Sequence, residues 1–151
     1  MILIMEPDLL GRIEAQGEGA YPDEGAGFLL GTDGRERIVR QIFPLPNARE
    51  EGARHNRYLI RSEDYLKAEL VAEMREMDVV GVFHSHPDHP DSPSEYDREW
   101  AQPNFSYLIT SIQAGKAMGS RSWRLAEDRT RFVGEEISIR QLEQPTEEGR
   151  D

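Results

Sequence analysis

An apolar run that ends in two histidines, Val79-Val80-Gly81-Val82-Phe83-His84-Ser85-His86, constrains this chain more than any other stretch. The run is typical of a buried β-strand, in which side chains two residues apart point to the same face. His84 and His86 would therefore present both imidazole rings on one side, within reach of one ion. We predict a strand over 79–83 that delivers a histidine pair to a place where a sheet edge meets a loop.

The segment after the histidines predicts an irregular, proline-containing loop and then a short helix. Ser92 can act as the N-cap, Pro93 suits the first helical position, and Glu95 completes a Ser-x-x-Glu capping box. Ser94 and Asp97 then fall in the first turns, where Asp97 can supply a third, anionic ligand. Two imidazoles and one carboxylate leave the fourth position of a tetrahedral zinc site open for water, whose pKa the ion lowers to roughly 7. An open position favours a catalytic site over a structural one.

Two motifs together resemble a known family. The pattern His84-x-His86-x7-Ser94-x2-Asp97 resembles the signature of the JAMM (MPN+) zinc metalloproteases, and Glu24-Gly25-Ala26-Gly27-Phe28-Leu29-Leu30-Gly31 resembles their Glu-x-x-Gly-x-Leu-x-Gly stretch. The resemblance covers most of the chain, and its strongest part lies between Glu24 and Asp97. It departs at Ala26, where many members carry a cysteine that we do not consider catalytic. It implies an α/β (α+β) fold of the cytidine-deaminase-like type, with a curved mixed β-sheet flanked by helices.

The resemblance also implies the roles of the site residues. Zn²⁺ would be held by His84, His86 and Asp97, with Glu24 as general base and Ser94 as a hydroxyl that stabilises the oxyanion. It implies hydrolysis of a peptide or isopeptide bond at the C-terminal Gly-Gly of a ubiquitin-like or sulfur-carrier protein. The chain lacks room for the long insertions of eukaryotic deubiquitinases, which fits a compact prokaryotic member.

Several alternatives stay open. His89 could complete a three-histidine site, Asp91 could replace Asp97, and Ser94 could serve only to satisfy helix amides. A different class of function is a non-catalytic MPN-type protein-interaction module, although such modules usually lack the ligand set. A DNA-repair-associated relative with the same motif is a third reading.

Composition bounds these readings. The 151 residues suit one domain, and the formal net charge of -11 disfavours nucleic acid and anionic membranes as partners. The chain has no cysteine, so any metal ligands must be histidine or carboxylate. Met1 to Met5 is too short for a signal peptide and no later stretch could span a bilayer, which predicts a cytoplasmic protein. We expect a single domain over 1–140 and a disordered tail over 141–151.

The rest of the pattern predicts alternating strands and helices. We expect a strand over 2–5, then a helix from Pro7 that Gly17 and Gly19 end. A glycine-rich strand should follow Glu24 and pass through a hairpin turn over 32–34 into a return strand over 37–43. After it we expect a loop over 44–57, which includes a surface His55, and a short strand over 58–60. Further strands are expected over 105–112, around 123–125 and over 132–139, with a turn bracketed by Gly115 and Gly119.

Two expectations concern packing. A helix capped by Ser62 carries Leu66, Leu70, Met74 and Met77 at helical spacing, so we predict that these side chains pack against the core. Trp100 is expected to pack the short helix after the histidine loop onto the sheet.

Overall fold

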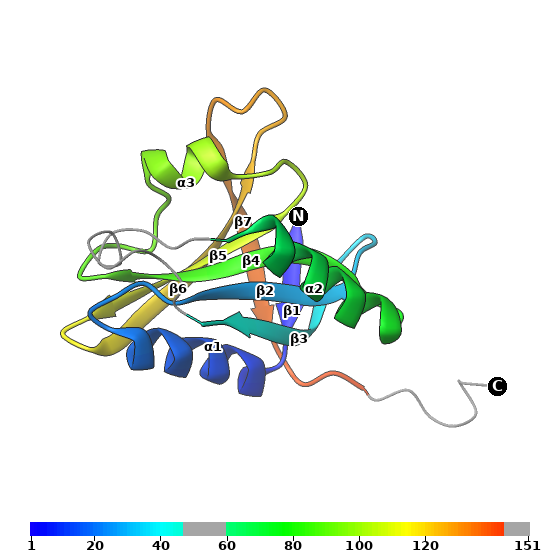
Figure 1. Cartoon of the computed structure of the whole chain (residues 1–151), viewed down its shortest axis with the longest axis horizontal. Coiled ribbons are helices and arrows are strands. Elements are labelled where there is room, and N and C mark those ends of the chain that lie inside the picture. The colour runs from blue at the N-terminus through cyan, green and yellow to red at the C-terminus, as the bar shows by residue number, and fades with distance from the viewer. Residues whose placement is uncertain (47–59, 144–151) are drawn as a thin grey trace.

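The computed structural model describes residues 1–46 and 60–143 (Figure 1). Helices and strands follow one another in the order β1 (Ile2–Met5), α1 (Pro7–Ala20), β2 (Ala26–Thr32), β3 (Arg37–Leu45), α2 (Ser62–Met74), β4 (Asp78–Pro87), α3 (Glu95–Trp100), β5 (Ser106–Gln113), β6 (Lys116–Leu125) and β7 (Phe132–Ile139). Three expectations lie wholly or largely outside the described residues. They concern His55, the first two residues of the predicted strand over 58–60, and most of the predicted tail.

The strands form one mixed sheet that closes into a barrel. Their order is β1-β3-β2-β4-β5-β6-β7, and β1 pairs in parallel with both β3 and β7 to close the circle. β4 and β5 are also parallel, whereas the other neighbours are antiparallel. The expected mixed α/β composition is therefore present, and closure through β1 and β7 goes beyond the curved sheet that the sequence led us to expect.

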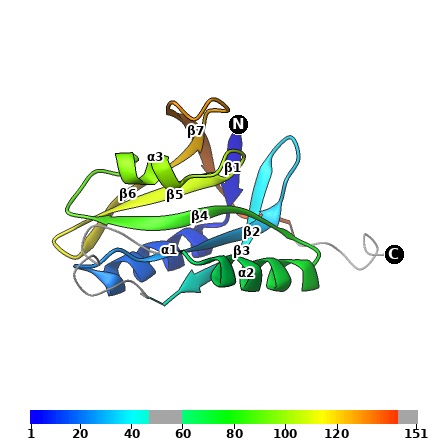
Figure 2. The same ribbon diagram turned by 45° about the horizontal axis from the view of Figure 1, so that its top comes forward.

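Two hydrophobic clusters cover the two faces of the central strands. Leu9 and Ile13 of α1 pack with Leu29, Phe83 and Leu108, which alternate with the residues of the second cluster. That second cluster lies under α2 and contains Phe28, Val82, Tyr107, Ala68 and Ala72, among others. α1 and α3 lie on opposite sides of the sheet, and α3 stands beside the end of β4 (Figure 2). This alternation decides which face of β4 carries the histidines.

The prediction that the large apolar side chains of α2 pack against the core was wrong. Leu66, Leu70 and Met74 are exposed by 57%, 52% and 84%, and only Met77, beyond the end of the helix, packs partly against the core. The buried residues of α2 are Ala68 and Ala72. Alanine has a short side chain, so the helix backbone can lie close to the sheet on that side, and the larger side chains point outward.

Other local expectations also need correction. Trp100 does not pack α3 onto the sheet, because 70% of its side-chain surface is exposed. Gly119 lies inside β6, so the turn is confined to residues 114–115, where both have a positive φ. The predicted cap at Ser62 was wrong by one residue: Arg61 is the N-cap of α2, and its amide donates a hydrogen bond to the Asp64 carboxylate.

Within residues 1–46 and 60–143, no helix combines the length and apolar character needed to cross a bilayer.

Candidate metal centre

β4 carries both histidines into the buried part of the molecule. The strand runs on to Pro87, beyond the predicted end at Phe83, and pairs with β2 on one side and β5 on the other. His84 and His86 point to the same face, with ring centroids 4.9 Å apart and their Nε2 atoms 3.1 Å apart. Because Val82 lies on that face too, the histidines lie on the side of the sheet that α2 and the second cluster cover.

α3 delivers a carboxylate to the same place. Ser94 is the N-cap: its Oγ accepts a hydrogen bond from the Asp97 amide at 3.1 Å, and its own amide donates to Asp97 Oδ2 at 2.8 Å. The helix therefore begins at Glu95, and the predicted cap at Ser92 was wrong by two residues. This reciprocal capping box fixes the backbone and side chain of Asp97 together.

The three side chains converge. Asp97 Oδ1 lies 3.2 Å from His84 Nε2, and Asp97 Oδ2 lies 3.1 Å from His86 Nε2. One donor atom from each residue lies within 4.8 Å of the others, and all three residues are buried. His89 is exposed, and neither it nor Asp91 belongs to this group among the described residues. The structure thus brings together the three expected ligands and leaves their two rivals outside.

The hydrogen bond on the far side of His86 fixes which ring nitrogen carries hydrogen. Nδ1 of His86 lies 2.8 Å from the Pro90 carbonyl oxygen, and because a carbonyl can only accept, Nδ1 must donate. In the neutral ring, Nε2 then has a lone pair that faces His84 and Asp97. A backbone carbonyl in this position is the usual device that orients a metal-binding imidazole.

Side chains hold the loop that carries this carbonyl. The carbonyl oxygens of His89 and Asp91, on either side of Pro90, accept hydrogen bonds from Ser111 Oγ at 2.6 Å and from Trp123 Nε1 at 2.9 Å. We call Ser111 and Trp123 the carbonyl clamp. Sequence reasoning missed both, since nothing in a serine or tryptophan on a strand indicates that a distant loop carbonyl will be its partner.

The charges at the site favour an anionic carboxylate. Burial alone would raise the pKa of Asp97, but the adjacent His84 and His86 imidazoles and the Ser94 amide more than offset it, so its pKa lies far below the ordinary value. Burial lowers the pKa of His86, yet Asp97, the Pro90 carbonyl and the charge of Glu24 outweigh burial and the pKa is raised. The site therefore attracts positive charge.

Glu24 lies next to this group. It is buried, and it lies two residues before the start of β2. Ala26 pairs with His84, while the amide of Gly25 donates to Ser85 Oγ at 2.8 Å and the Ser85 amide donates back to the Gly25 carbonyl at 3.0 Å. Continuing this antiparallel register places Glu24 opposite His86, on the same face. The β2 glycines permit this packing, because a Cβ on Gly27 would overlap the Phe83 ring and the Phe43 carbonyl.

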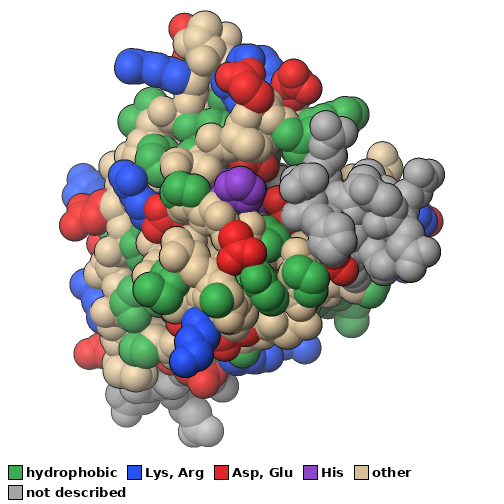
Figure 3. All heavy atoms as spheres, turned by 90° about the vertical axis from the view of Figure 1, so that its left-hand side faces the viewer, with side chains coloured by type: hydrophobic (Ala, Val, Ile, Leu, Met, Phe, Trp, Pro, Cys, Tyr) green, Lys and Arg blue, Asp and Glu red, His purple; other side chains and the backbone are tan. Residues whose placement is uncertain are grey.

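The donor set fits Zn²⁺. Two imidazole nitrogens and one carboxylate, converging from a strand and a helix, are a frequent ligand set of catalytic zinc. The carbonyl that holds His86 from outside adds the support that such ligands require. This end of the molecule, which lies on the left of Figure 1, faces the viewer in Figure 3, where hydrophobic and acidic side chains are visible at the surface; His84 and His86 themselves are buried.

Comparisons with known proteins identify a family and relatives of this chain. A family model described as prokaryotic homologs of the JAB domain matches residues 6–126, which include every residue from Glu24 to Asp97. The CysO-cysteine peptidase of Mycobacterium tuberculosis is 28% identical over 127 residues, covering 83% of this chain and 84% of that protein. The desampylase of Haloferax volcanii is 33% identical over 104 residues, covering 68% and 73%. A solution structure of a protein from Salinibacter ruber is 41% identical, covers 94% of each chain and has a TM-score of 0.72.

Proposed function

The chain belongs to the prokaryotic homologs of the JAB domain, and from this membership we propose that it is a zinc-dependent peptidase or isopeptidase. Its substrate would be a ubiquitin-like or sulfur-carrier protein joined through its C-terminus to another group. The names of the relatives, a CysO-cysteine peptidase and a desampylase, support hydrolysis of this kind of bond. The observation that carries the proposal is the convergence of three buried ligand atoms from His84, His86 and Asp97.

These three residues would hold the metal. A bound zinc ion supplies a Lewis acid that polarises a carbonyl and makes a water molecule acidic near neutral pH. Asp97 contributes the negative charge of the ligand set, and its capping box keeps the carboxylate in place without the ion. Asp97 of α3 and the histidines of β4 would therefore need little rearrangement to bind the ion.

Glu24 is the proposed general base. A carboxylate within reach of the attacking water can accept its proton and later pass it to the leaving amine. Its burial, its position opposite His86 and the effect of its charge on that ring support this assignment. Asp97 is also buried and also raises the pKa of His86, but it is already assigned as a metal ligand.

Ser94 has two roles to separate. Its Oγ accepts the hydrogen bond that caps α3, which is the purely structural alternative. Its hydroxyl hydrogen is still able to donate, and Ser94 is exposed beside the cluster, so we propose that it donates to the oxyanion that develops on the scissile carbonyl.

The substrate tail is proposed to bind in an extended form. Glycines at the scissile bond have no side chains and can pass close to a buried centre, and an extended tail can add along the edge of a groove by main-chain hydrogen bonds.

Cleavage of a ubiquitin-like domain fused through Gly-Gly to a reporter tests the proposal. The purified protein loaded with zinc should release the reporter, and a chelator should stop the reaction. Glu24→Gln should bind zinc normally but turn over at least about 100-fold more slowly. Failure of the zinc-loaded protein to cleave such fusions would contradict the proposal and favour an interaction module. A Glu24→Gln protein that cleaves as fast as the wild type would contradict the assignment of Glu24 as the general base.

A further inference from the structure

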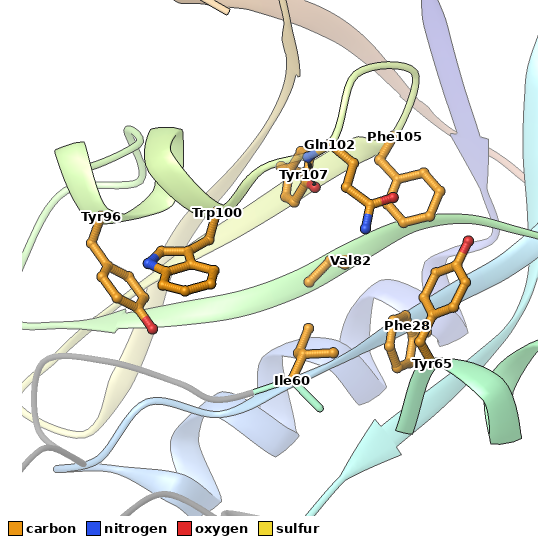
Figure 4. Close-up of a pocket in the computed structure, with 9 residues that line it drawn as sticks. All are labelled: Phe28, Ile60, Tyr65, Val82, Tyr96, Trp100, Gln102, Phe105 and Tyr107. Atoms are coloured by element: carbon orange, nitrogen blue, oxygen red, sulfur yellow. Dashed lines mark hydrogen bonds between the residues drawn. The ribbon is translucent and has the colours of Figure 1, made fainter. Parts of the chain in front are cut away.

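An aromatic cavity lies beside the candidate centre (Figure 4). Its volume is about 220 Å³, which exceeds the roughly 150 Å³ of an engineered apolar cavity that accepts benzene. We call it the aromatic pocket, and the residues that line it are Phe28, Ile60, Tyr65, Val82, Tyr96, Trp100, Gln102, Phe105 and Tyr107. None of them is charged, although the chain as a whole has a net charge of -11.

The pocket and the centre share their supporting elements. Val82 forms part of the pocket and His84 part of the centre; the two lie on one face of β4, about 7 Å apart along the strand. On α3, Tyr96 lines the pocket and the next residue, Asp97, belongs to the centre. In Figure 4, Tyr96 and Trp100 lie at the end of the pocket toward which β4 runs. A ligand bound at the centre can therefore reach the pocket without leaving this face.

Trp100 is the feature that points to a ligand. Its side chain is 70% exposed, and its ring lies 6.1 Å from that of Tyr96 on the preceding turn. Large aromatic side chains on the rim of an apolar pocket are typical anchors in binding sites. The exposure of Trp100, which contradicted its expected role in the core, agrees with this use.

We propose that the aromatic pocket binds one large apolar side chain of the substrate tail and sets the sequence preference of the peptidase. This inference rests on the proposed function, because it takes the scissile carbonyl to lie at His84, His86 and Asp97. Two residues of an extended peptide span about 7 Å, which matches the step from the centre to Val82. If the two residues before the scissile bond are glycines, the occupant is the side chain of the third residue before the bond.

The chemistry of the lining selects the class of side chain. Leucine or phenylalanine would bury apolar surface against Phe28, Val82 and Trp100, whereas an acidic side chain would lose its hydration without a partner. Arginine is the competing occupant, since a guanidinium can stack on Trp100 or Tyr96. The experiment must separate these two classes.

Binding can be measured apart from cleavage. Calorimetry with zinc-loaded Glu24→Gln would compare eight-residue peptides that end in Gly-Gly and carry Leu, Phe, Ala, Arg or Asp at the third position from the end. We expect Leu and Phe to bind at least about tenfold more tightly than Ala, the discrimination typical of an apolar pocket. Equal affinity for Leu and Ala, or tightest binding of Arg, would overturn the proposal.

Two variants and a control tie the preference to the pocket. In the Glu24→Gln background, Trp100→Ala should reduce the preference for Leu over Ala to less than threefold. Gln102→Glu, at an exposed lining position, should shift preference from Leu toward Arg. Leu66→Ala removes another exposed apolar side chain, on the outward face of α2, and should change nothing. A preference that survives Trp100→Ala and Gln102→Glu unchanged would refute the pocket.

Failures of the two proposals differ. If peptides show the Leu preference but no fusion is cleaved, the pocket stands and the proposed hydrolysis fails. If fusions are cleaved at equal rates with Leu and Ala at the third position, hydrolysis stands and the pocket does not select the substrate.

Discussion

The hydrogen on Nδ1 of His86 is held by the Pro90 carbonyl, and that carbonyl lies between two others that the carbonyl clamp holds. Ser111 and Trp123 therefore act on the centre through the backbone, without contacting a ligand atom. Losing outer support of this kind typically weakens metal binding 10- to 100-fold.

We predict that Ser111→Ala and Trp123→Phe each weaken zinc binding about tenfold, because each removes one hydrogen bond to the loop. Competition with a chelator of known affinity measures this. The matched control is Ser120→Ala, which removes a comparable hydrogen bond of 2.7 Å to Thr110 between the same two strands but away from the loop. Affinities of the two clamp variants equal to that of the control would refute the clamp.

Some residues of the site could be predicted from the sequence, and others could not. The two-residue spacing of His84 and His86 predicts a shared face because strand periodicity is a local property. The clamp depends on which strands neighbour β4, and Ser111 and Trp123 come from β5 and β6, far away in the sequence. Their side-chain types carry no signal of that arrangement.

At the scale of elements, the start of α3 combines a structural and a proposed catalytic role in Ser94. Two overlapping boxes compete in the sequence, one from Ser92 to Glu95 and one from Ser94 to Asp97, and local pattern cannot decide between them. The structure uses the second, which orients the Asp97 carboxylate toward the histidines.

Ser94→Gly separates the two roles, because glycine at an N-cap costs only a few tenths of a kcal/mol and has no side chain that can donate a hydrogen bond. We expect Ser94→Gly to stay within about 0.5 kcal/mol of the wild type in unfolding free energy and to lose about 100-fold in kcat. Ser94→Ala should lose kcat and also about 1 kcal/mol of unfolding free energy. Steady-state kinetics and urea unfolding measure the two quantities. Wild-type kcat in Ser94→Gly would mean that Ser94 is only a cap.

α2 shows the limit of periodicity. Leu66, Leu70 and Met74 share one face of the helix, and Ala68 and Ala72 lie on another, which is the buried one. Hydrophobic size favoured the leucine face as the buried one. Packing against the sheet decides which face is buried, because the short alanine side chains let the helix backbone lie close to the sheet.

Across the whole molecule, a polar network joins residues of β3, β5, β6 and β7. Ser106 and Ser122 donate to Glu135 Oε1 at 2.7 and 2.8 Å, and Arg124 donates to Oε2 at 2.6 Å. Arg37 of β3 joins through Ser106 at 2.9 Å. Closure itself pairs β1 with β7 across nearly the full chain, a contact for which no local pattern exists.

Glu135→Gln should destabilise the fold by about 3 kcal/mol, because the new amide group would face Arg124 or the serines as a donor against donors. Glu136→Gln, one residue along on the exposed face of β7, should change stability by less than about 0.5 kcal/mol. Urea unfolding of both variants checks this. Equal midpoints would show that the network does not hold the barrel together.

We expect His84, His86 and Asp97 to form one zinc site. Zinc titration and elemental analysis of the dialysed protein can decide this, with Asp97→Asn and His89→Ala measured beside the wild type. We predict one tightly bound zinc per chain in the wild type and in His89→Ala, and none in Asp97→Asn. Zinc retained by Asp97→Asn, or lost from His89→Ala, would show that this ligand set is wrong.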